Sequence, residues 1–374
     1  MRRALVAGAA ALGVLVGGAA QAGPVPPLHT ADVTFPVTAA FSSVHLSADL
    51  GHVTVTAGKK AAVQAHEEWN LRPPTVHVTE SRGVLTVTAT CDASESVGPA
   101  SVDPGNTVNE CVDDLSVTLP HAASVTADSN SGGVSVVATH GDLQLHSANG
   151  DITMRDLFAP HLSATTDVGN IVGTRVHVGY AATLKAGNGS ITASTYFYLP
   201  DASWVRLDAS TDVGDITLNG LYMVEATATT GQGNISVSHM DVRDMFVRAG
   251  TGDMRFAEGE ISHLVVHSDN GSLTNDMASI TSSTWATGSG AINFDGGGSF
   301  ILAASSGKGD VTVISRYGRY SGPPSFAVQA DTDNGTVTVR GIKVVPDSLW
   351  RIRAHSDDGN VSVLGEPCPP GTCG

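Results

Sequence analysis

Hydrophobic and polar residues alternate along most of the chain in short runs that meet at a glycine. Pairs such as Met245 and Val247 stand seven and five residues before a glycine, and pairs such as Ile235 and Val237 stand two and four residues after one. Alternation with a period of two places successive side chains on opposite faces of a strand, whereas a helix needs a 3.6-residue stripe. Each run therefore predicts a strand, a glycine turn and a second strand.

The glycines recur at a nearly fixed interval, which is 19 residues five times in succession between Gly214 and Gly309. Such a period is typical of stacked repeats, because one strand-turn-strand unit cannot bury its own inner face. We therefore predict an all-β fold, a single-stranded parallel β-helix (β-solenoid) with 19-residue rungs. The lack of a hexapeptide repeat favours right-handed winding. The repeat glycines are Gly132, Gly150, Gly169, Gly189, Gly214, Gly233, Gly252, Gly271, Gly290, Gly309, Gly335 and Gly359.

The regularity of the repeat also suggests how the chain is divided. The first residues have a basic start, an apolar middle and an Ala20-Gln21-Ala22 pattern, which together predict a cleaved secretory signal peptide. The frames around Gly51 and Gly83 are interrupted, so they either join the stack or form a separate sheet. The predicted parts are a signal peptide (1–22), an N-terminal β region with irregular rungs (23–120), a regular solenoid (121–365) and a cysteine-containing tail (366–374).

Charge and export narrow the range of partners. The chain has 36 acidic and 20 basic residues, and its formal net charge is −16. An acidic protein repels nucleic acid and anionic lipid, so we expect neither as a partner. The predicted signal peptide points to a bacterial protein that is secreted or held at the cell surface, with no transmembrane segment in the mature chain. The oligomeric state is left open.

The four cysteines are expected to form disulfides, because secreted chains meet an oxidising environment. Four cysteines allow three pairings. The local choice joins Cys91 with Cys111 across an acidic loop and Cys368 with Cys373 in the tail.

Aspartates beside the glycine turns suggest calcium, which Gly/Asp-rich repeats bind where carboxylates of adjacent rungs meet. Directly after the glycines the acids are dispersed, and no two aspartates occupy neighbouring rungs. This spacing favours turn-forming residues over a row of ions, and we expect no cofactor. A single ion is left open near Asp333, Asp357 and Asp358, where two acidic turns adjoin.

A column of hydroxyl side chains stands three residues after the glycines, on the outward side of the second strand. Threonine suits solvated strand positions, so β-propensity alone accounts for such a column. The alternative is a hydroxyl array that binds a repeating surface such as a polysaccharide, a mineral or ice. Val172 and Arg255 interrupt the column. Its members are Thr153, Thr192, Thr217, Ser236, Thr274, Asn293, Thr312, Thr338 and Ser362.

Two insertions break the period and carry aromatic residues. Insertions in solenoids map to loops, often on the binding face, and aromatic rings with arginine can stack on sugars or hold an acidic partner. The alternative is that both loops only cover the flank of the solenoid. The candidate binding residues are Tyr196, Phe197, Tyr198 and Trp204 in the first insertion, and Arg316, Tyr317, Arg319 and Tyr320 in the second.

Several segments resemble a known family. They are SANGDITM (147–154), STDVGDITL (210–218), DTDNGTVTV (331–339), SDDGNVSV (356–363) and LSVTLP (115–120). These segments resemble the bacterial secreted putative-adhesin family, a domain of unknown function, over residues 29–365. The resemblance implies a parallel β-helix at the cell envelope and no catalytic residues.

Catalytic signatures are missing from the sequence. It has no G-x-S-x-G, no H-E-x-x-H and no phosphate-binding glycine loop. We therefore predict no enzyme, but an adhesin-like binding protein for a polysaccharide or another cell-envelope component. The alternatives are a rigid spacer and a polysaccharide-active enzyme, which would need two carboxylates about 5–10 Å apart in a cleft.

Overall fold

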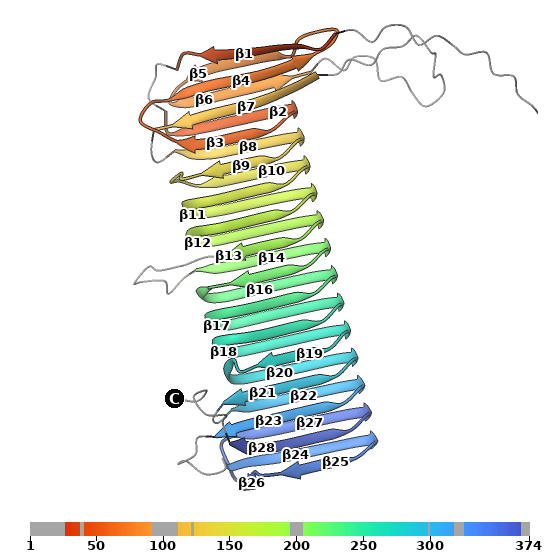
Figure 1. Ribbon diagram of the computed structural model, residues 1–374. Helices are drawn as coiled ribbons and strands as arrows, with labels where there is room; N and C mark the ends of the chain where they lie inside the picture. Colours follow the sequence, from red (N-terminus) through yellow and green to blue (C-terminus); the bar gives the residue numbers. More distant parts are fainter. Residues whose placement is uncertain are drawn as a thin grey trace, which may run out of the picture.

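The computed structural model describes residues 27–37, 41–91, 111–120, 123–194, 205–297, 300–317 and 325–367. Within these ranges every regular element is a β-strand, and the strands stack into one long ladder (Figure 1). The predicted all-β fold is therefore confirmed. The predicted signal peptide and the Cys368–Cys373 pair lie outside the described residues. Below, a rung is one strand–glycine–strand unit, its segment before the glycine is incoming, and its segment after the glycine is outgoing.

The strands follow the chain from one end of the ladder to the other. The N-terminal strands are β1 (His29–Phe35), β2 (Ser43–Leu50), β3 (Val53–Ala57), β4 (Ala62–Trp69), β5 (Thr75–Ser81), β6 (Val84–Thr90), β7 (Cys111–Leu119), β8 (Ser124–Ser131) and β9 (Val134–Val137). The middle strands are β10 (Leu143–Asn149), β11 (Ile152–Val168), β12 (Ile171–Asn188), β13 (Ile191–Ser194), β14 (Arg206–Val213), β15 (Ile216–Asn219), β16 (Tyr222–Gln232), β17 (Ile235–Thr251), β18 (Met254–Asn270), β19 (Leu273–Asp276), β20 (Ser279–Ser289) and β21 (Ile292–Gly297). The C-terminal strands are β22 (Ile301–Lys308), β23 (Val311–Tyr317), β24 (Ser325–Asn334), β25 (Val337–Arg340), β26 (Lys343–Val344), β27 (Arg351–Asp358) and β28 (Val361–Pro367).

Neighbouring rungs of the middle pair in parallel and in register. Ile235 on β17 faces Met254 on β18, which in turn faces Leu273 on β19. The inward side chains of both segments are buried in one continuous core, because each rung covers the inner face of the next. The right-handed winding stays a prediction.

The repeat glycines form a column that leaves no space for side chains. Gly252 has a φ of +140°, and a Cβ built on it would lie 1.9 Å from the carbonyl oxygen of Gly233 in the preceding rung. At Gly189 the corresponding distance, to the oxygen of Gly169, would be 1.8 Å. Glycine is thus required by the turn and also by the close approach of the next rung. The period in the sequence records this contact between rungs.

A second column, of buried hydroxyls, joins the rungs just inside the glycines. Thr230 Oγ1 donates a hydrogen bond of 2.9 Å to the carbonyl oxygen of Gly214 in the preceding rung. The bond satisfies a hydroxyl that would otherwise be buried without a partner. Ala186 and Ala249 occupy the same position without a hydroxyl. The donors of the column are Ser129, Ser147, Thr166, Thr211, Thr230, Ser268, Thr287, Ser306, Thr332 and Ser356.

The rungs at the C-terminal end do not stack in sequence order. Strand β27 pairs with both β22 and β24, and β28 pairs with both β23 and β25. The last rung of the sequence therefore lies between the two rungs that precede it. The rung made of β24 and β25, with the short β26 beside it, ends the rod.

The N-terminal end shows the same interleaving. Strand β2 pairs with β6 and β8, and β3 pairs with β7 and β9, so the rung of Gly51 belongs to the same stack as the regular rungs. Antiparallel strands finish the rod here: β5 pairs with β6, β4 with β7, and β1 with β4. Gly83 turns the β5–β6 hairpin, so the strand–turn–strand pattern around it is antiparallel and is not a rung of the repeat.

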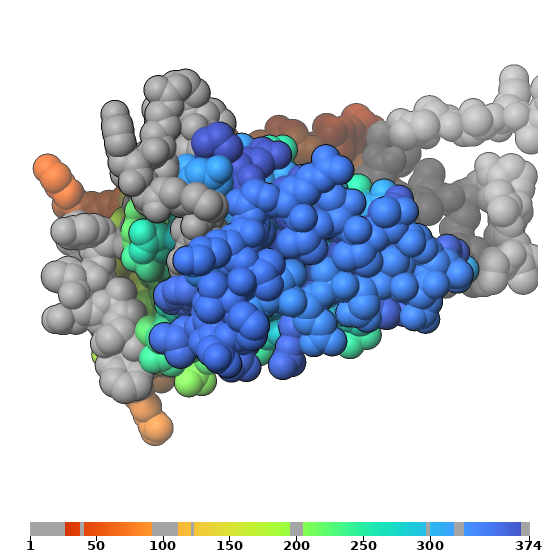
Figure 2. All heavy atoms as spheres, turned by 90° about the horizontal axis from the view of Figure 1, so that it is seen from below, coloured from red at the N-terminus to blue at the C-terminus, as the bar shows by residue number. Residues whose placement is uncertain are grey.

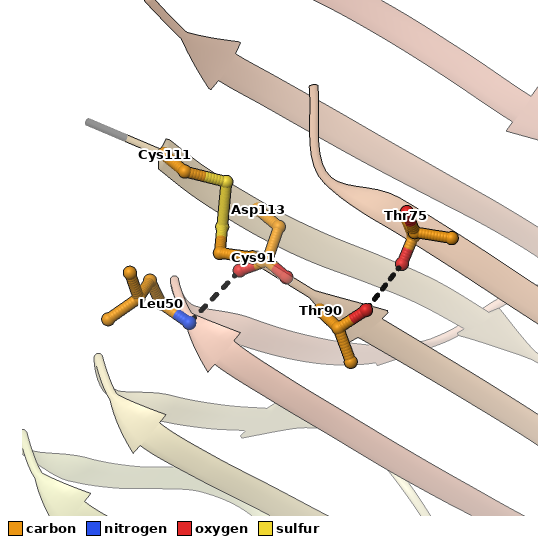
Figure 3. Close-up of a disulfide and its surroundings, with 6 residues drawn as sticks. All are labelled: Leu50, Thr75, Thr90, Cys91, Cys111 and Asp113. Carbon is orange, nitrogen blue, oxygen red and sulfur yellow. Dashed lines mark hydrogen bonds between the residues drawn. A yellow bond between two sulfur atoms is a disulfide. The ribbon is translucent and has the colours of Figure 1, made fainter. Parts of the chain in front are cut away.

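A disulfide and a buried acid lie at this N-terminal end (Figure 3). Cys91 is bonded to Cys111, which confirms the predicted pair and links the end of β6 to the start of β7. Beside the disulfide, the fully buried Asp113 accepts the N–H of Leu50 at 3.2 Å. Burial raises the pKa of Asp113 to about 7. Burial also raises the pKa of Glu67, which lies opposite Asp113 on strand β4.

Candidate binding surface

The outward side chains of the outgoing segments form a surface that we call the outgoing face. Its central column stands three residues after the glycines, and its members pair directly from rung to rung, as Thr217 does with Thr192 and Ser236. Strand spacing places successive hydroxyls about 4.8 Å apart. In spatial order the column is Thr338, Ser362, Thr312, Asn293, Thr274, Arg255, Ser236, Thr217, Thr192, Val172, Thr153, Ser135, Thr54 and Ser116.

The acids beside the glycines are engaged in a hydrogen-bonded ladder. Asp215 Oδ1 accepts the backbone N–H of Asn234 in the next rung at 2.7 Å, and Asn234 Oδ1 accepts that of Asp253 at 2.9 Å. Asn170 also donates its side-chain amide to Asp151, at 3.2 Å. Acids alternate with amides and hydroxyls along this ladder. Side-chain oxygens can therefore accept a backbone N–H of the next rung without placing two carboxylates in neighbouring rungs. These carboxylates therefore stabilise the stack.

Two acids near the C-terminal turns, Asp331 and Asp357, contact a histidine. His355 lies with Nε2 2.7 Å from Asp357 Oδ1 and Nδ1 2.8 Å from Asp331 Oδ2, and these hydrogen bonds raise its pKa. Nowhere in the described part of the chain do three His, Cys, Asp or Glu side chains come together as a metal site requires. The single ion considered near Asp333, Asp357 and Asp358 stays a prediction.

A groove of about 440 Å³ lies where the outgoing face meets the N-terminal strands. Its walls come from β1, β4, β7 and β3, which are adjacent in the sheet. The hydroxyl column continues into the groove, because Thr54 faces Ser116, Ser116 faces Gln64, and Gln64 faces Thr34. The column therefore ends in the groove.

A row of acids and histidines runs beside that column in the groove. His66 Nδ1 lies 2.7 Å from Asp32 Oδ1. The pKa of His66 is raised mainly by its hydrogen bond to Asp32 and less by its hydrogen bond to Glu68. Asp114 Oδ1 accepts the backbone N–H of His52 at 2.6 Å, and His52 Nδ1 accepts the N–H of Gly133 at 2.9 Å. An accepting Nδ1 carries no proton, so neutral His52 holds its proton on Nε2.

Of the aromatic and arginine residues proposed for binding, the structure describes two. Arg316 is largely buried and bonds to Asp295 at 2.6 Å and Glu366 at 3.2 Å, so its guanidinium already has carboxylate partners within the chain. Tyr317 ends strand β23 and is half-buried. A binding role for the remaining candidates stays a prediction, because they lie outside the described residues: Tyr196, Phe197, Tyr198, Trp204, Arg319 and Tyr320.

Sequence reasoning missed the groove. Its walls include β1 and β4, which are antiparallel and carry no repeat glycine, so the period gives no signal for them. His52 directly follows Gly51, but sequence reasoning did not include it in the column after the glycines. The repeat could not place Asp32 or His66 beside it, because no local pattern specifies which strand covers the end of a stack.

The stacked rungs and their columns agree with a known family. The family model described as Toastrack DUF4097 matches residues 42–196 and again residues 190–364. The chain belongs to the Toastrack DUF4097 family. The expected resemblance to a family that is a domain of unknown function is thereby confirmed. The two Toastrack matches overlap over residues 190–196, and Tyr196 of the first aromatic insertion ends the first match.

Three solved structures share low similarity with this Toastrack chain. A putative adhesin from Bacteroides fragilis is 14% identical over 72% of this chain and 97% of its own, with a TM-score of 0.32. A putative adhesin from Parabacteroides merdae is 14% identical over 74% and 95%, with a TM-score of 0.33. A putative cell adhesion protein from Clostridium sporogenes is 8% identical over 90% and 100%, with a TM-score of 0.20. Similarity this low supports no conclusion about mechanism.

No curated protein matches the chain. Within the described ranges, no helix has the length and apolar character to cross a bilayer.

Proposed function

We propose that this protein is a non-enzymatic, adhesin-like binding protein of the cell exterior that recognises a polysaccharide or another cell-envelope polymer along its outgoing face. The observation that carries the proposal is the in-register column from Thr338 to Ser116, which is made of hydroxyls except at Asn293, Arg255 and Val172 and continues into the N-terminal groove. Hydroxyls repeated about every 4.8 Å on a stacked sheet present the same donors and acceptors many times. Such an array suits a repeating ligand, because many weak contacts add up along a polymer.

The location at the cell exterior is supported by the cysteines and by the predicted signal peptide. Disulfides persist in oxidising compartments and are rare in the bacterial cytoplasm. The Cys91–Cys111 bond fits export of the chain. The formal charge of −16 argues against nucleic acid as the polymer.

The hydrogen-bond partners of the acidic side chains favour binding of a polysaccharide over its hydrolysis. A glycosidase aims two carboxylates at one glycosidic bond. On the outgoing face, Asp215 and Asp253 accept backbone N–H groups of the next rung, and in the groove Asp32 bonds to His66. These acids have structural partners, so we infer an unmodified ligand and no cofactor.

The proposal is tested by removing hydroxyls from one face of the rod at a time. The first variant combines Thr217→Val, Thr274→Val and Thr312→Val on the outgoing face, and the matched control combines Thr227→Val, Thr229→Val and Thr284→Val on the incoming side. Valine keeps the shape and strand propensity of threonine while removing its hydrogen bonds. The measurement is retention of the purified protein on insoluble bacterial cell-wall polysaccharide.

We expect the outgoing-face variant to lose at least about tenfold in affinity, which corresponds to 1.4 kcal/mol, while the control binds like wild type. Equal loss in both variants, or none in either, would contradict a role for the outgoing face. Release of new reducing ends from the polysaccharide would instead show an enzyme.

A further inference from the structure

The C-terminal end of the rod exposes side chains that are core residues elsewhere. Val337 and Val339 occupy the inward positions of the terminal rung, yet they are 42% and 39% exposed. Their counterparts in the neighbouring rung, Val361 and Val363, are 0% exposed. Figure 2 looks onto this end of the rod, where C-terminal residues form most of the visible surface.

Other apolar residues and free strand edges gather at the same end. Val344, Leu349 and Trp350 are also exposed there. Among the described strands, β25 pairs only with β28, and residues 327–334 of β24 pair only with β27. Both strands therefore present unpaired backbone groups along their outer edges, which is the usual template for adding another strand.

The outward charges flanking this end differ between the two segments of the terminal rung. The incoming β24 carries Asp331 and Asp333, whereas Arg340 ends the outgoing β25 and Lys343 begins β26. The chain runs toward the glycine turn along β24 and away from it along β25. Consider a second copy related to the first by a two-fold axis that runs along the strand direction of the terminal rung. The acidic β24 of each copy then lies along the basic β25 of the other copy, and the two strands are antiparallel.

We propose that two copies of this chain associate end to end through their terminal rungs, with β24 of each pairing antiparallel with β25 of the other. This two-fold arrangement keeps the inward valines of both copies inside one continuous core. It also brings Asp331, which contacts His355 of its own chain, next to Arg340 of the partner subunit. The two residues lie either directly opposite or on the diagonal, which are the two positions where cross-strand charges interact. The contact is isologous, as expected for a closed dimer.

The first test measures the oligomeric state of the full mature chain by analytical ultracentrifugation and small-angle scattering. We expect a dimer whose maximum dimension approaches twice that of one rod. The double variant Val337→Lys and Val339→Lys should raise the dimer Kd at least about 100-fold, because 1.4 kcal/mol per buried valine is tenfold. Leu28→Lys, at an exposed apolar residue of the opposite end, is the matched control and should leave the dimer unchanged.

The second test is a charge exchange that does not depend on the stability of one variant. Asp331→Arg places like charges opposite each other in its homodimer, and so does Arg340→Asp, so each alone should weaken the dimer about tenfold. An equimolar mixture restores both attractive pairs and should return the dimer to wild-type affinity. A wild type that stays monomeric at about 100 μM, a dimer unaffected by the valine changes, or a mixture that fails to recover would overturn the proposal.

Discussion

At both ends of the rod the rungs stack out of sequence order, but only the N-terminal end is covered by further strands. At each end one rung lies between two others that both precede it or both follow it in the sequence. The N-terminal end is then covered by the antiparallel strands β1, β4 and β5, whereas the C-terminal end leaves Val337 and Val339 exposed. The repeat therefore specifies how rungs follow one another but leaves the closing of the stack to residues outside it.

The strands that cover the N-terminal end bury two carboxyl groups. Covering strand β7 with β4 buries Asp113 and Glu67, and this burial raises the pKa of both carboxyls. The Cys91–Cys111 disulfide joins the start of β7 to the end of β6 at the same end of the rod. The open end has no such buried acids or disulfide among its described residues, and we infer that a second copy closes it. The following predictions test this contrast, beginning with the largest effect.

The glycine column should be far less tolerant than the glycine of the N-terminal hairpin. Gly252→Ala places a Cβ 1.9 Å from the carbonyl oxygen of Gly233, so the rungs must separate. At Gly83 the nearest atom to an added Cβ is 3.8 Å away, and only the φ of +79° opposes alanine. We expect losses of more than about 4 kcal/mol for Gly252→Ala and about 1 kcal/mol for Gly83→Ala, measured by urea unfolding. Similar losses at both sites would contradict the contact between rungs as the cause.

Removing the disulfide should destabilise the N-terminal end while leaving the middle intact. Cys91 and Cys111 are 20 residues apart, and freeing a loop of that size costs about 3 kcal/mol. In Cys91→Ser with Cys111→Ser, amide hydrogen exchange should accelerate in β4 to β7 and stay slow in β15 to β20. Faster exchange along the whole rod would mean that the end and the middle unfold together.

The buried acid should make the N-terminal end less stable as pH rises. A folded-state pKa raised to about 7 keeps Asp113 protonated in the fold at pH values where the unfolded chain has lost that proton. Its contribution is thus fully present below about pH 4 and lost as pH rises through about 7, with about 2–3 kcal/mol lost between about pH 5 and pH 8. The raised pKa of His66 acts in the same direction at higher pH.

Asp113→Asn removes the largest of these titrating groups and should reduce the pH dependence of unfolding between about pH 5 and pH 8 to the part that Glu67 and His66 contribute. Asp253→Asn, at an exposed acid of the ladder, is the control and should leave the wild-type slope unchanged. A slope that persists undiminished in Asp113→Asn would assign the effect to other groups.

Substitutions in the buried hydroxyl column should change the free energy of unfolding least. The change should have opposite signs at Thr230 and Ala249. Thr230→Val removes the donor to Gly214 and should cost about 1 kcal/mol. Ala249→Ser supplies the donor that the carbonyl of Gly233 lacks and should add about 0.5–1 kcal/mol. Thermal unfolding of both variants checks this pair, and a loss at Ala249 would mean that the column has no room for the hydroxyl.

The rungs could be predicted from the sequence, but the order in which they stack at the two ends could not. The glycine frame predicted the strands around Gly214 to Gly309, because one contact between rungs fixes the same residues in each unit. It could not show that the rung of Gly359 lies between those of Gly309 and Gly335, since every rung edge offers the same hydrogen bonds. The antiparallel β1 and β4 carry no repeat glycine, and so the groove that they line was missed.

The most direct test of the central claim is the deletion of one whole rung, residues 234–252, which rejoins Gly233 to Asp253 and keeps the glycine frame. If equivalent rungs build an extended binding face, the shortened protein should fold, lose about 4.8 Å of length in small-angle scattering and bind cell-wall polysaccharide with moderately reduced affinity. Deleting residues 243–252 breaks the frame and should prevent folding. An unfolded 234–252 deletion would contradict the stack of equivalent rungs, and unchanged affinity would contradict the extended binding face.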